Sequence, residues 1–171
     1  MMLEKIELRK KLKNISLVDD DYSMTVINRL QNLIKDKIVC TYIPLENEIN
    51  INMYLKGQSL LTTTCIMDGE IKICIYEEPF EKNSFNVYQP VNLKNIEKVD
   101  IFLVPGVGFD KKGTRLGKGS GIYDQLLADH LNSTFIGITD KNHIVDEIPL
   151  ENHDIQMHSL LTHDEFIDIN L

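Results

Sequence analysis

The sequence predicts a three-layer α/β fold, in which a mainly parallel sheet carries helices on both faces. Two apolar, β-rich runs, over residues 37–43 and 101–104, each end at a proline, as buried strands do where they leave a parallel sheet. Residues 134–139 repeat the pattern, and a helix is predicted over 121–131, between the last two runs. Strand, helix and strand in this order form a βαβ unit, which places the two strands parallel to each other.

Two helices are predicted before the first strand. Leu8, Leu12 and Ile15 recur at near-helical spacing among basic residues, which predicts a short basic amphipathic helix. Ser16 is the expected N-cap of a second helix, and residues 19–21 would place aspartates in its first turn, where the helix dipole favours carboxylates. The apolar residues expected on the buried face of this second helix are Tyr22, Val26, Leu30 and Leu33.

The remaining segments are less regular. Weaker strands are predicted over residues 60–66 and 71–76. Residues 77–98 are polar and contain two prolines, which is typical of an excursion from the core and not of a linker between domains. With 171 residues and no internal repeat, residues 1–171 are expected to form one domain.

Composition and charge exclude several classes of protein. Lys and Arg number 18 against 26 Asp and Glu, and the net charge of −8 disfavours binding to nucleic acid or to an anionic membrane. No apolar run approaches the roughly 18 residues that span a bilayer, and charges interrupt the first residues where a secretory signal would be apolar. We therefore expect a cytoplasmic protein. Its odd set of cysteines, Cys40, Cys65 and Cys74, is expected to consist of buried free thiols.

An anionic ligand would have to meet a local basic patch, and two segments provide one. Residues 4–13 contain five basic and two acidic residues, and residues 105–121 contain four basic and one acidic residue, so each is +3. The second patch directly follows the predicted strand over 101–104, at the sheet edge where open α/β folds bind ligands. Six of the nine glycines of the chain lie there: Gly106, Gly108, Gly113, Gly117, Gly119 and Gly121.

This glycine-rich segment has the composition of a phosphate-binding loop. Clustered glycines let main-chain N–H groups approach a phosphate, and Arg115 and Lys118 are interleaved with them. Asp124, near the start of the following helix, could hold magnesium beside the phosphates. The spacing matches neither the P-loop motif nor GxGxxG. The alternative interpretation is a solvated basic loop with flexible glycines.

The stretch PGVGFDKKGTRLGKGSGIYD, residues 105–124, resembles the signature of the 5-formyltetrahydrofolate cyclo-ligases, also called 5,10-methenyltetrahydrofolate synthetases. That signature consists of a strand followed by Pro-Gly-x-x-Phe-Asp and then Gly-x-Arg-Leu-Gly-x-Gly-x-Gly-Tyr-Tyr-Asp. One signature position differs, because Ile122 stands where the first tyrosine is expected.

The resemblance continues outside this loop. Lys5 and Arg9 fit an early Lys-x-x-x-Arg helix that is associated with the nucleotide phosphates. Glu48, in the segment YIPLENEI, matches an acid that contacts folate, and the His-Asp pair at 153–154 matches the closing segment of the family. Residues 60–90 depart from the family pattern, since they lack its usual proline after the third strand.

The resemblance implies ATP-dependent cyclisation of 5-formyltetrahydrofolate, with or without a polyglutamate tail, to 5,10-methenyltetrahydrofolate. In the family mechanism the γ-phosphoryl group moves to the formyl oxygen, and the second folate nitrogen then attacks the activated carbon. The implied cofactors are ATP and Mg²⁺, and the implied fold is similar to that of NagB, RpiA and the CoA transferases. A monomer or weak homodimer is expected.

The resemblance also implies a set of site residues. Catalytic roles are expected for Arg115, Lys118 and Tyr123. Nucleotide contacts are expected for Lys5, Arg9, Gly113, Arg115, Leu116, Gly117, Lys118, Gly119, Ser120, Gly121, Tyr123 and Asp124. Folate contacts are expected for Glu48 and Tyr123, and magnesium ligands are expected to be Asp124 and Asp154. Arg115 is expected to act from the loop and not from the core.

Several alternatives remain open at this stage. Lys5 could be a solvated helix charge, Glu48 could cap a helix beginning near Ile49, and Tyr123 could be a core residue with a satisfied hydroxyl. A relative of the same fold that binds nucleotide or folate with weak or lost turnover is favoured by Ile122 and by the divergent middle of the chain. A sugar-phosphate isomerase or an acyl-carrier transferase would instead catalyse its reaction without ATP.

Overall fold

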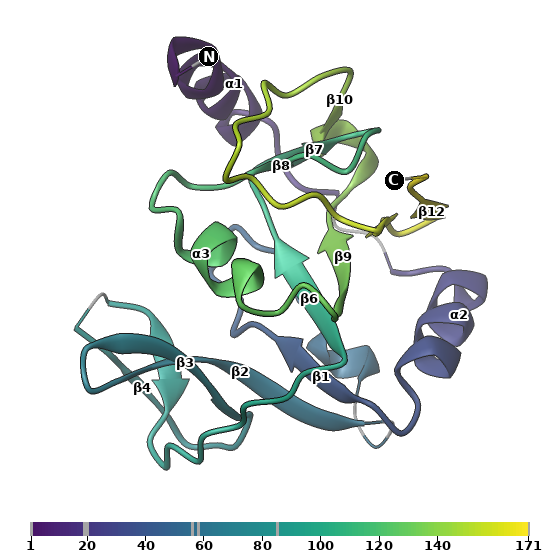
Figure 1. Cartoon of the computed structure of the whole chain (residues 1–171). Coiled ribbons are helices and arrows are strands. Elements are labelled where there is room, and N and C mark those ends of the chain that lie inside the picture. Colours follow the sequence, from purple (N-terminus) through teal and green to yellow (C-terminus); the bar gives the residue numbers. More distant parts are fainter. Residues whose placement is uncertain (1, 19–20, 56, 58, 85, 171) are drawn as a thin grey trace.

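The central element of the fold is a seven-stranded sheet (Figure 1). The computed structural model describes residues 2–18, 21–55, 57, 59–84 and 86–170. The helices are α1 (Met2–Lys13), α2 (Met24–Ile34) and α3 (Ile122–Ala128), with 3-10 turns η1 (Asn52–Tyr54) and η2 (Lys141–His143). The strands are β1 (Ile38–Thr41), β2 (Leu60–Met67), β3 (Glu70–Ile75), β4 (Phe80–Lys82), β5 (Tyr88–Pro90), β6 (Ile101–Pro105), β7 (Gly108–Asp110), β8 (Arg115–Leu116), β9 (Thr134–Ile138), β10 (Ile144–Val145), β11 (Ser159–Leu161) and β12 (Phe166–Asp168).

The prediction of a mainly parallel α/β sheet is confirmed. The strand order is β12-β11-β9-β6-β1-β2-β3, and the four pairings from β11 across to β2 are parallel. The edge strands β3 and β12 run antiparallel to their neighbours. All five predicted strands are present, and each begins and ends within two residues of the predicted limits. The βαβ unit is β6, α3 and β9, whose two strands lie side by side in the sheet.

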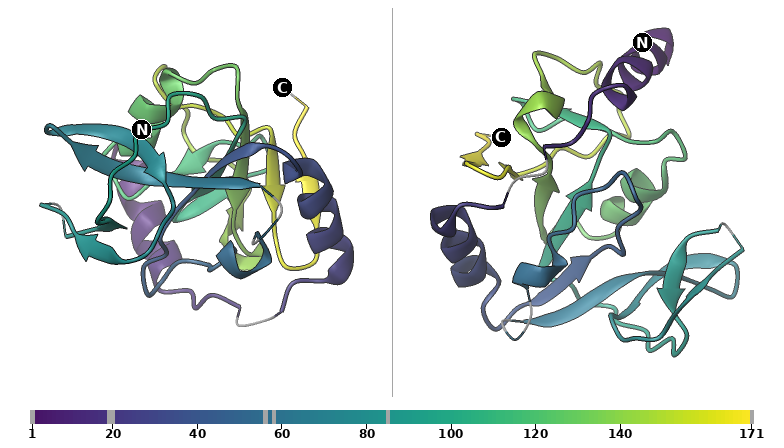
Figure 2. Two further views of the ribbon diagram at one scale, coloured as in Figure 1. Left: turned by 90° about the horizontal axis from the view of Figure 1, so that it is seen from below. Right: turned by 180° about the vertical axis from the view of Figure 1, so that it is seen from behind.

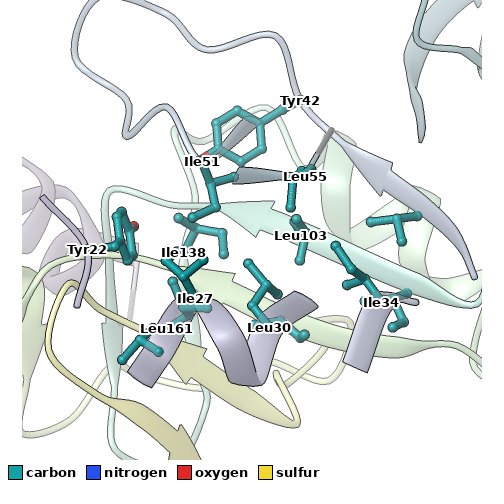
Figure 3. Close-up of a cluster of buried hydrophobic side chains, with 14 residues drawn as sticks. Tyr22, Ile27, Leu30, Ile34, Tyr42, Ile51, Leu55, Leu103, Ile138 and Leu161 are labelled. Carbon is teal, nitrogen blue, oxygen red and sulfur yellow. The ribbon is translucent and has the colours of Figure 1, made fainter. Parts of the chain in front are cut away.

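Alternate residues of the central strands point to opposite sides of the sheet and form two apolar clusters. The first cluster joins α2 to the sheet through residues that include Ile27, Leu30, Ile34, Leu103, Ile138 and Leu161 (Figure 3). The second cluster joins α3 to the sheet through residues that include Cys40, Phe102, Val104, Leu127, Phe135 and Leu160. A fully buried Leu or Ile contributes about 1.5–3 kcal/mol, so these clusters fix the ends of β1 and β6 firmly.

The second helix begins later than predicted. Ser23, and not Ser16, is its N-cap, and the Ser23 hydroxyl accepts a hydrogen bond from the Val26 N–H at 3.4 Å. Of the expected acidic first turn, Asp19 and Asp20 lie outside the described residues, and Asp21 precedes the helix. Leu33 is 40% exposed, so the apolar face of this helix is narrower than predicted.

The first helix is present, but it is less amphipathic than predicted. Leu12 is buried, whereas Leu3 on the same helix is 76% exposed. The basic residue Lys5 is buried instead. The helix is therefore anchored partly by charge, as the site described below explains.

Residues 77–98 leave the core as predicted, but they contain two short strands. β4 and β5 form an antiparallel two-stranded sheet, which lies beside β2 and β3 and extends from the main body of the molecule (Figure 2). The Gln89 side chain attaches it to β2, because its Oε1 accepts a hydrogen bond from the Ile66 N–H at 2.9 Å; the same oxygen accepts the Asn83 amide at 3.2 Å within the hairpin. This hairpin forms one wall of the pocket described below.

Two further expectations concern the whole chain. Cys40, Cys65 and Cys74 are free and buried, as predicted, and burial raises the pKa of Cys40 to about 12, which makes its thiol unreactive. Among the described residues no helix is long and apolar enough to cross a membrane.

A buried aspartate organises the base of the glycine-rich segment. Asp110 ends β7 and is fully buried; its Oδ1 accepts hydrogen bonds from the N–H groups of Lys112 and Thr114, both at 2.9 Å. Its Oδ2 accepts the Ile148 N–H, also at 2.9 Å, so one carboxylate joins the β7–β8 turn to the segment that follows β10. This sequence position matches the aspartate of the Pro-Gly-x-x-Phe-Asp signature, for which sequence reasoning gave no role.

We predict that Asp110→Ala destabilises the protein by about 2 kcal/mol or more, because the buried N–H groups of Thr114 and Ile148 lose their acceptor, and each such loss costs about 1–3 kcal/mol. Denaturant unfolding measures the change. The matched control is Asp146→Ala at an exposed position, which should cost less than about 0.5 kcal/mol. Equal stability of Asp110→Ala and the control would contradict the anchoring role.

Candidate functional site

The candidate site is a pocket of about 200 Å³ at the carboxyl ends of β1 and β6. Five segments line it: residues 42–48 after β1, Pro105 at the end of β6 with Gly106, the glycine-rich loop and start of α3, the β2–β3 pair, and the β4–β5 hairpin through Asn83, Val87 and Tyr88. Parallel strands that end at one edge open a crevice there, which is where α/β folds bind ligands. The position therefore agrees with the expectation for the segment that follows residues 101–104.

Glu48 is fixed in this pocket by a tight turn after β1. Its Oε2 accepts the Leu45 N–H at 3.0 Å, and its own N–H donates to the Leu45 carbonyl at 2.9 Å. The Tyr42 hydroxyl donates to the Ile49 carbonyl at 2.6 Å and supports the turn from below. The carboxylate thus closes its own turn and caps no helix near Ile49, where the chain forms only the later 3-10 turn η1.

Arg115 lies at the centre of the site, but in strand β8 and not on a loop as expected. It is only 7% exposed, and its Nη2 donates to Asp124 Oδ2 at 2.7 Å. Gly117 makes room for it, because a Cβ there would lie 2.7 Å from Arg115 Nη1. The Nε of Arg115 is buried and has no hydrogen-bond partner within the described part of the chain. A buried N–H group without an acceptor is costly, so this atom marks a place for a ligand oxygen.

Lys118 bridges the glycine-rich loop to the turn after β1. Its Nζ donates to Glu48 Oε1 at 2.6 Å, and the lysine side chain is 41% exposed while that of Glu48 is 13% exposed. The family resemblance assigns Lys118 to the nucleotide and Glu48 to the folate, and these two residues form one ion pair.

Lys5 is not a solvated helix charge. It is buried, and its Nζ donates to Asp154 Oδ2 at 2.6 Å and to Glu151 Oε2 at 2.9 Å. Burial acts to lower the pKa of Lys5, but the hydrogen bonds to Asp154 and Glu151 outweigh it, and the pKa lies above its ordinary value. The ammonium group is therefore charged at neutral pH and ties α1 to the closing segment of the chain.

Arg9 lies one helical turn after Lys5 on α1 and reaches the glycine-rich loop. Its Nε donates to the Gly117 carbonyl at 2.7 Å. A Cβ added to Gly119 would lie 3.9 Å from the Arg9 guanidinium carbon, so the same arginine borders the next glycine as well. Gly121, with a φ of +69°, forms the N-cap of α3 in a conformation that favours glycine.

Tyr123 belongs both to the pocket and to the core. It lines the pocket, packs against the second apolar cluster and lies 5.4 Å from the Arg115 guanidinium carbon, ring centroid to carbon. Burial raises the pKa of the Tyr123 hydroxyl above its ordinary value. The hydroxyl therefore stays protonated at neutral pH and can position a ligand by hydrogen bonding, but it cannot act as a base.

The structure brings some predicted residues into the pocket and leaves others outside its lining. The predicted residues that line the pocket are Glu48, Arg115, Gly117, Lys118, Ser120, Gly121 and Tyr123. Asp124 joins them through Arg115, whereas Asp154 pairs with Lys5, so the two expected magnesium ligands contact different cations. Leu116 is fully buried among apolar side chains that include Leu12, and the Gly113 carbonyl accepts the Met157 N–H at 2.8 Å.

Sequence reasoning missed one wall of the pocket. Val87 and Tyr88, from the turn before β5 and its first residue, line the pocket although they are 38% and 42% exposed. Cys65 and Ile71, from β2 and β3, line the same side. The available signal was the pair of adjacent apolar residues 87–88 within segment 77–98, where the other apolar residues stand singly.

The chemistry of these groups suits a phosphate ester beside a planar, partly apolar molecule. Arg115 offers an unpartnered buried Nε–H, and the glycines at 119 and 121 leave space beside the main chain. Glu151, His153 and Asp154 present ligand atoms within 4.8 Å of one another, and carboxylate oxygens are the donors that Mg²⁺ prefers. Within the described residues this cluster contains Asp154 but not Asp124, so its donor set fits a magnesium ion at Asp154.

Several known proteins are similar to this chain. The model of the 5-formyltetrahydrofolate cyclo-ligase family matches residues 4–163. The 5-formyltetrahydrofolate cyclo-ligase of Haemophilus influenzae is 35% identical over 91 residues, which are 50% of this chain and 49% of that protein. The Saccharomyces cerevisiae cyclo-ligase is 27% identical over 204 residues, with 95% and 97% covered.

Two solved structures have the same fold. The NMR structure of 5,10-methenyltetrahydrofolate synthetase from Aquifex aeolicus is 27% identical, with a TM-score of 0.78 over 96% of this chain and 92% of that one. The synthetase from Mycoplasma pneumoniae is 19% identical, with a TM-score of 0.63 over 93% and 95%, and shows the fold alone. The chain spans about half the length of the first curated relatives it matches. Because the family model matches nearly the whole chain, the protein belongs to the 5-formyltetrahydrofolate cyclo-ligase family.

Proposed function

We propose that this protein catalyses the ATP-dependent cyclisation of 5-formyltetrahydrofolate to 5,10-methenyltetrahydrofolate, with release of ADP and phosphate. The observation that carries the proposal is the buried guanidinium of Arg115, which lines the pocket beside Gly117 of the glycine-rich loop and whose Nε has no hydrogen-bond partner among the described residues. A positive group held in a buried position stabilises charge that moves during phosphoryl transfer, and it needs no reorganisation to do so. Family membership supports the same reaction.

The proposed roles are those that the family resemblance implies for each residue. Arg115 and Lys118 hold the phosphates during transfer to the formyl oxygen, and Lys5 and Arg9 orient the polyphosphate from α1. The main chain of the glycine-rich loop, from Gly113 and Leu116 through Gly117, Gly119, Ser120 and Gly121, surrounds it. Glu48 and Tyr123 hold the folate, so that the second folate nitrogen attacks the activated carbon while water is excluded.

Magnesium belongs to the same proposal. Asp124 and Asp154 would hold the ion, which when bound offsets negative charge on the phosphates. Their partners Arg115 and Lys5 are then available to the phosphate oxygens. The remaining parts of the proposal concern the whole chain. Residues 1–171 form one three-layer fold of the NagB, RpiA and CoA-transferase type. The protein is cytoplasmic, is a monomer or weak homodimer, accepts a polyglutamate tail on its substrate and has no nucleic-acid or membrane partner.

The direct test mixes the purified protein with MgATP and 5-formyltetrahydrofolate and follows the near-ultraviolet absorbance of the methenyl product. We expect absorbance to rise only when ATP and the folate are both present. Product formation without ATP would contradict the proposal and indicate an isomerase or transferase. No product, with both ligands bound, would instead indicate a weak or inactive relative, which the isoleucine at position 122 in the pocket wall favours.

Arg115→Lys tests the role of the buried guanidinium. Lysine keeps one positive charge but cannot supply the Nε–H and the Asp124 contact together, so we predict a fall in kcat/KM of about 100-fold or more. The thermal midpoint should move by less than about 4 °C, which corresponds to about 1 kcal/mol in a chain of this size. Turnover within threefold of the wild type would refute the assignment.

Glu48→Gln tests the folate contact. The amide keeps the size of the side chain but removes the negative charge, so KM for 5-formyltetrahydrofolate should rise about tenfold, with a smaller change in KM for ATP. Steady-state kinetics with each substrate varied in turn measure both values. The matched control is Glu46→Gln, at an exposed position in the same turn, which should leave both values unchanged. A control that matched the Glu48 variant would rule out a specific contact.

A further inference from the structure

We propose that Lys118 is a positioning residue that couples nucleotide binding to folate binding through Glu48. The inference rests on the proposed function, because it assigns the nucleotide phosphates to Lys118 and the folate to Glu48. It adds that the two binding events are linked by exchange of one ion pair.

Both oxygens of the Glu48 carboxylate are already engaged. Oε2 accepts the Leu45 N–H at 3.0 Å and belongs to the turn, so it is held in place by the backbone. Oε1 accepts Lys118 Nζ at 2.6 Å. Folate presents N–H donors on its pterin ring, and a carboxylate binds such donors most strongly when no cation neutralises it. Lys118 therefore competes with the folate for Glu48.

The ammonium group of Lys118 can contact a second partner, the nucleotide phosphates. Lys118 lies between Gly117 and Gly119, and its side chain is 41% exposed, so it can turn without unpacking a core. Glu48, by contrast, is 13% exposed and cannot follow it. A polyphosphate on the glycine-rich loop carries more negative charge than one carboxylate and would draw the ammonium group away from Glu48.

The place of the pair in the fold supports this exchange. Glu48 and Lys118 line the folate pocket. Both also line a neighbouring cavity of about 340 Å³, which is bordered by the end of α1 and the residues that follow it, 12–17. The ion pair is thus shared by two cavities, and its opening changes both. A movement of Lys118 toward the phosphates exposes Glu48 Oε1 to the folate.

The sign of the coupling follows from this competition. Nucleotide removes Lys118 from Glu48 and should tighten folate binding, and by thermodynamic linkage folate should tighten nucleotide binding by the same factor. An ion pair with one exposed partner is weak, so the expected factor is about two- to fivefold.

The experiment measures the Kd of 5-formyltetrahydrofolate by calorimetry in two conditions, without nucleotide and with saturating AMP-PNP and Mg²⁺. AMP-PNP is used because its γ-phosphoryl group is not transferred. We expect the nucleotide analogue to lower the Kd about two- to fivefold in the wild type. In Lys118→Met the Kd without nucleotide should be equal to or lower than that of the wild type, and the analogue should not change it. Lys118→Arg, unlike Lys118→Met, should retain the coupling, since arginine can still form an ion pair with Glu48.

The control is Lys112→Met, which removes the same charge from the same segment at an exposed pair with Glu147 and should keep the wild-type coupling. Unchanged coupling in Lys118→Met, or weaker folate binding in that variant without nucleotide, would overturn the inference. Binding of both ligands to the wild type without coupling would overturn it and leave the proposed function intact. Failure of the wild type to bind either ligand would overturn both.

Discussion

The site depends on the pairing of its cations with acceptors of the protein itself. Lys5, Arg115 and Lys118 each contact a carboxylate at 2.6–2.7 Å, and Arg9 contacts the Gly117 carbonyl at 2.7 Å. Pairing matters most for Lys5 and Arg115, which are buried, because an unpaired buried charge is costly. These contacts also join α1, the glycine-rich loop, the turn after β1 and the closing segment at one end of the sheet.

The sheet supplies the rigid frame on which these contacts are built. Apolar clusters on opposite sides of the central strands fix the ends of β1 and β6, and Asp110 fixes the turn that leads into β8. The parts of the site that must stay fixed, the strand ends and turns, are thus distinct from the long charged side chains that would exchange partners. A phosphoryl-transfer site needs both, since it must hold its ligands in line and still admit them.

Sequence patterns predicted the strands well because their information is local. The runs that became β1, β6 and β9 are apolar and end at turns, and the glycine-rich segment between them carries its own chemistry. The start of α2 was wrong because Ser16 and Ser23 are equivalent as local caps, and packing of the helix on the sheet decides between them. The partners of Lys5 and the pocket wall at Val87 and Tyr88 depend on contacts between distant segments, which no local pattern encodes.

The central claim is that a nucleotide phosphate accepts a hydrogen bond from Arg115 Nε, for which no acceptor is present among the residues that the structure describes. ¹⁵N NMR of the arginine Nε–H groups, with the Arg115 signal assigned by its loss in Arg115→Lys, tests this most directly. Titration with AMP-PNP and Mg²⁺ should shift the Arg115 Nε–H signal in proportion to the bound fraction, because that group gains an acceptor. A signal that stays unchanged at saturation would contradict the account.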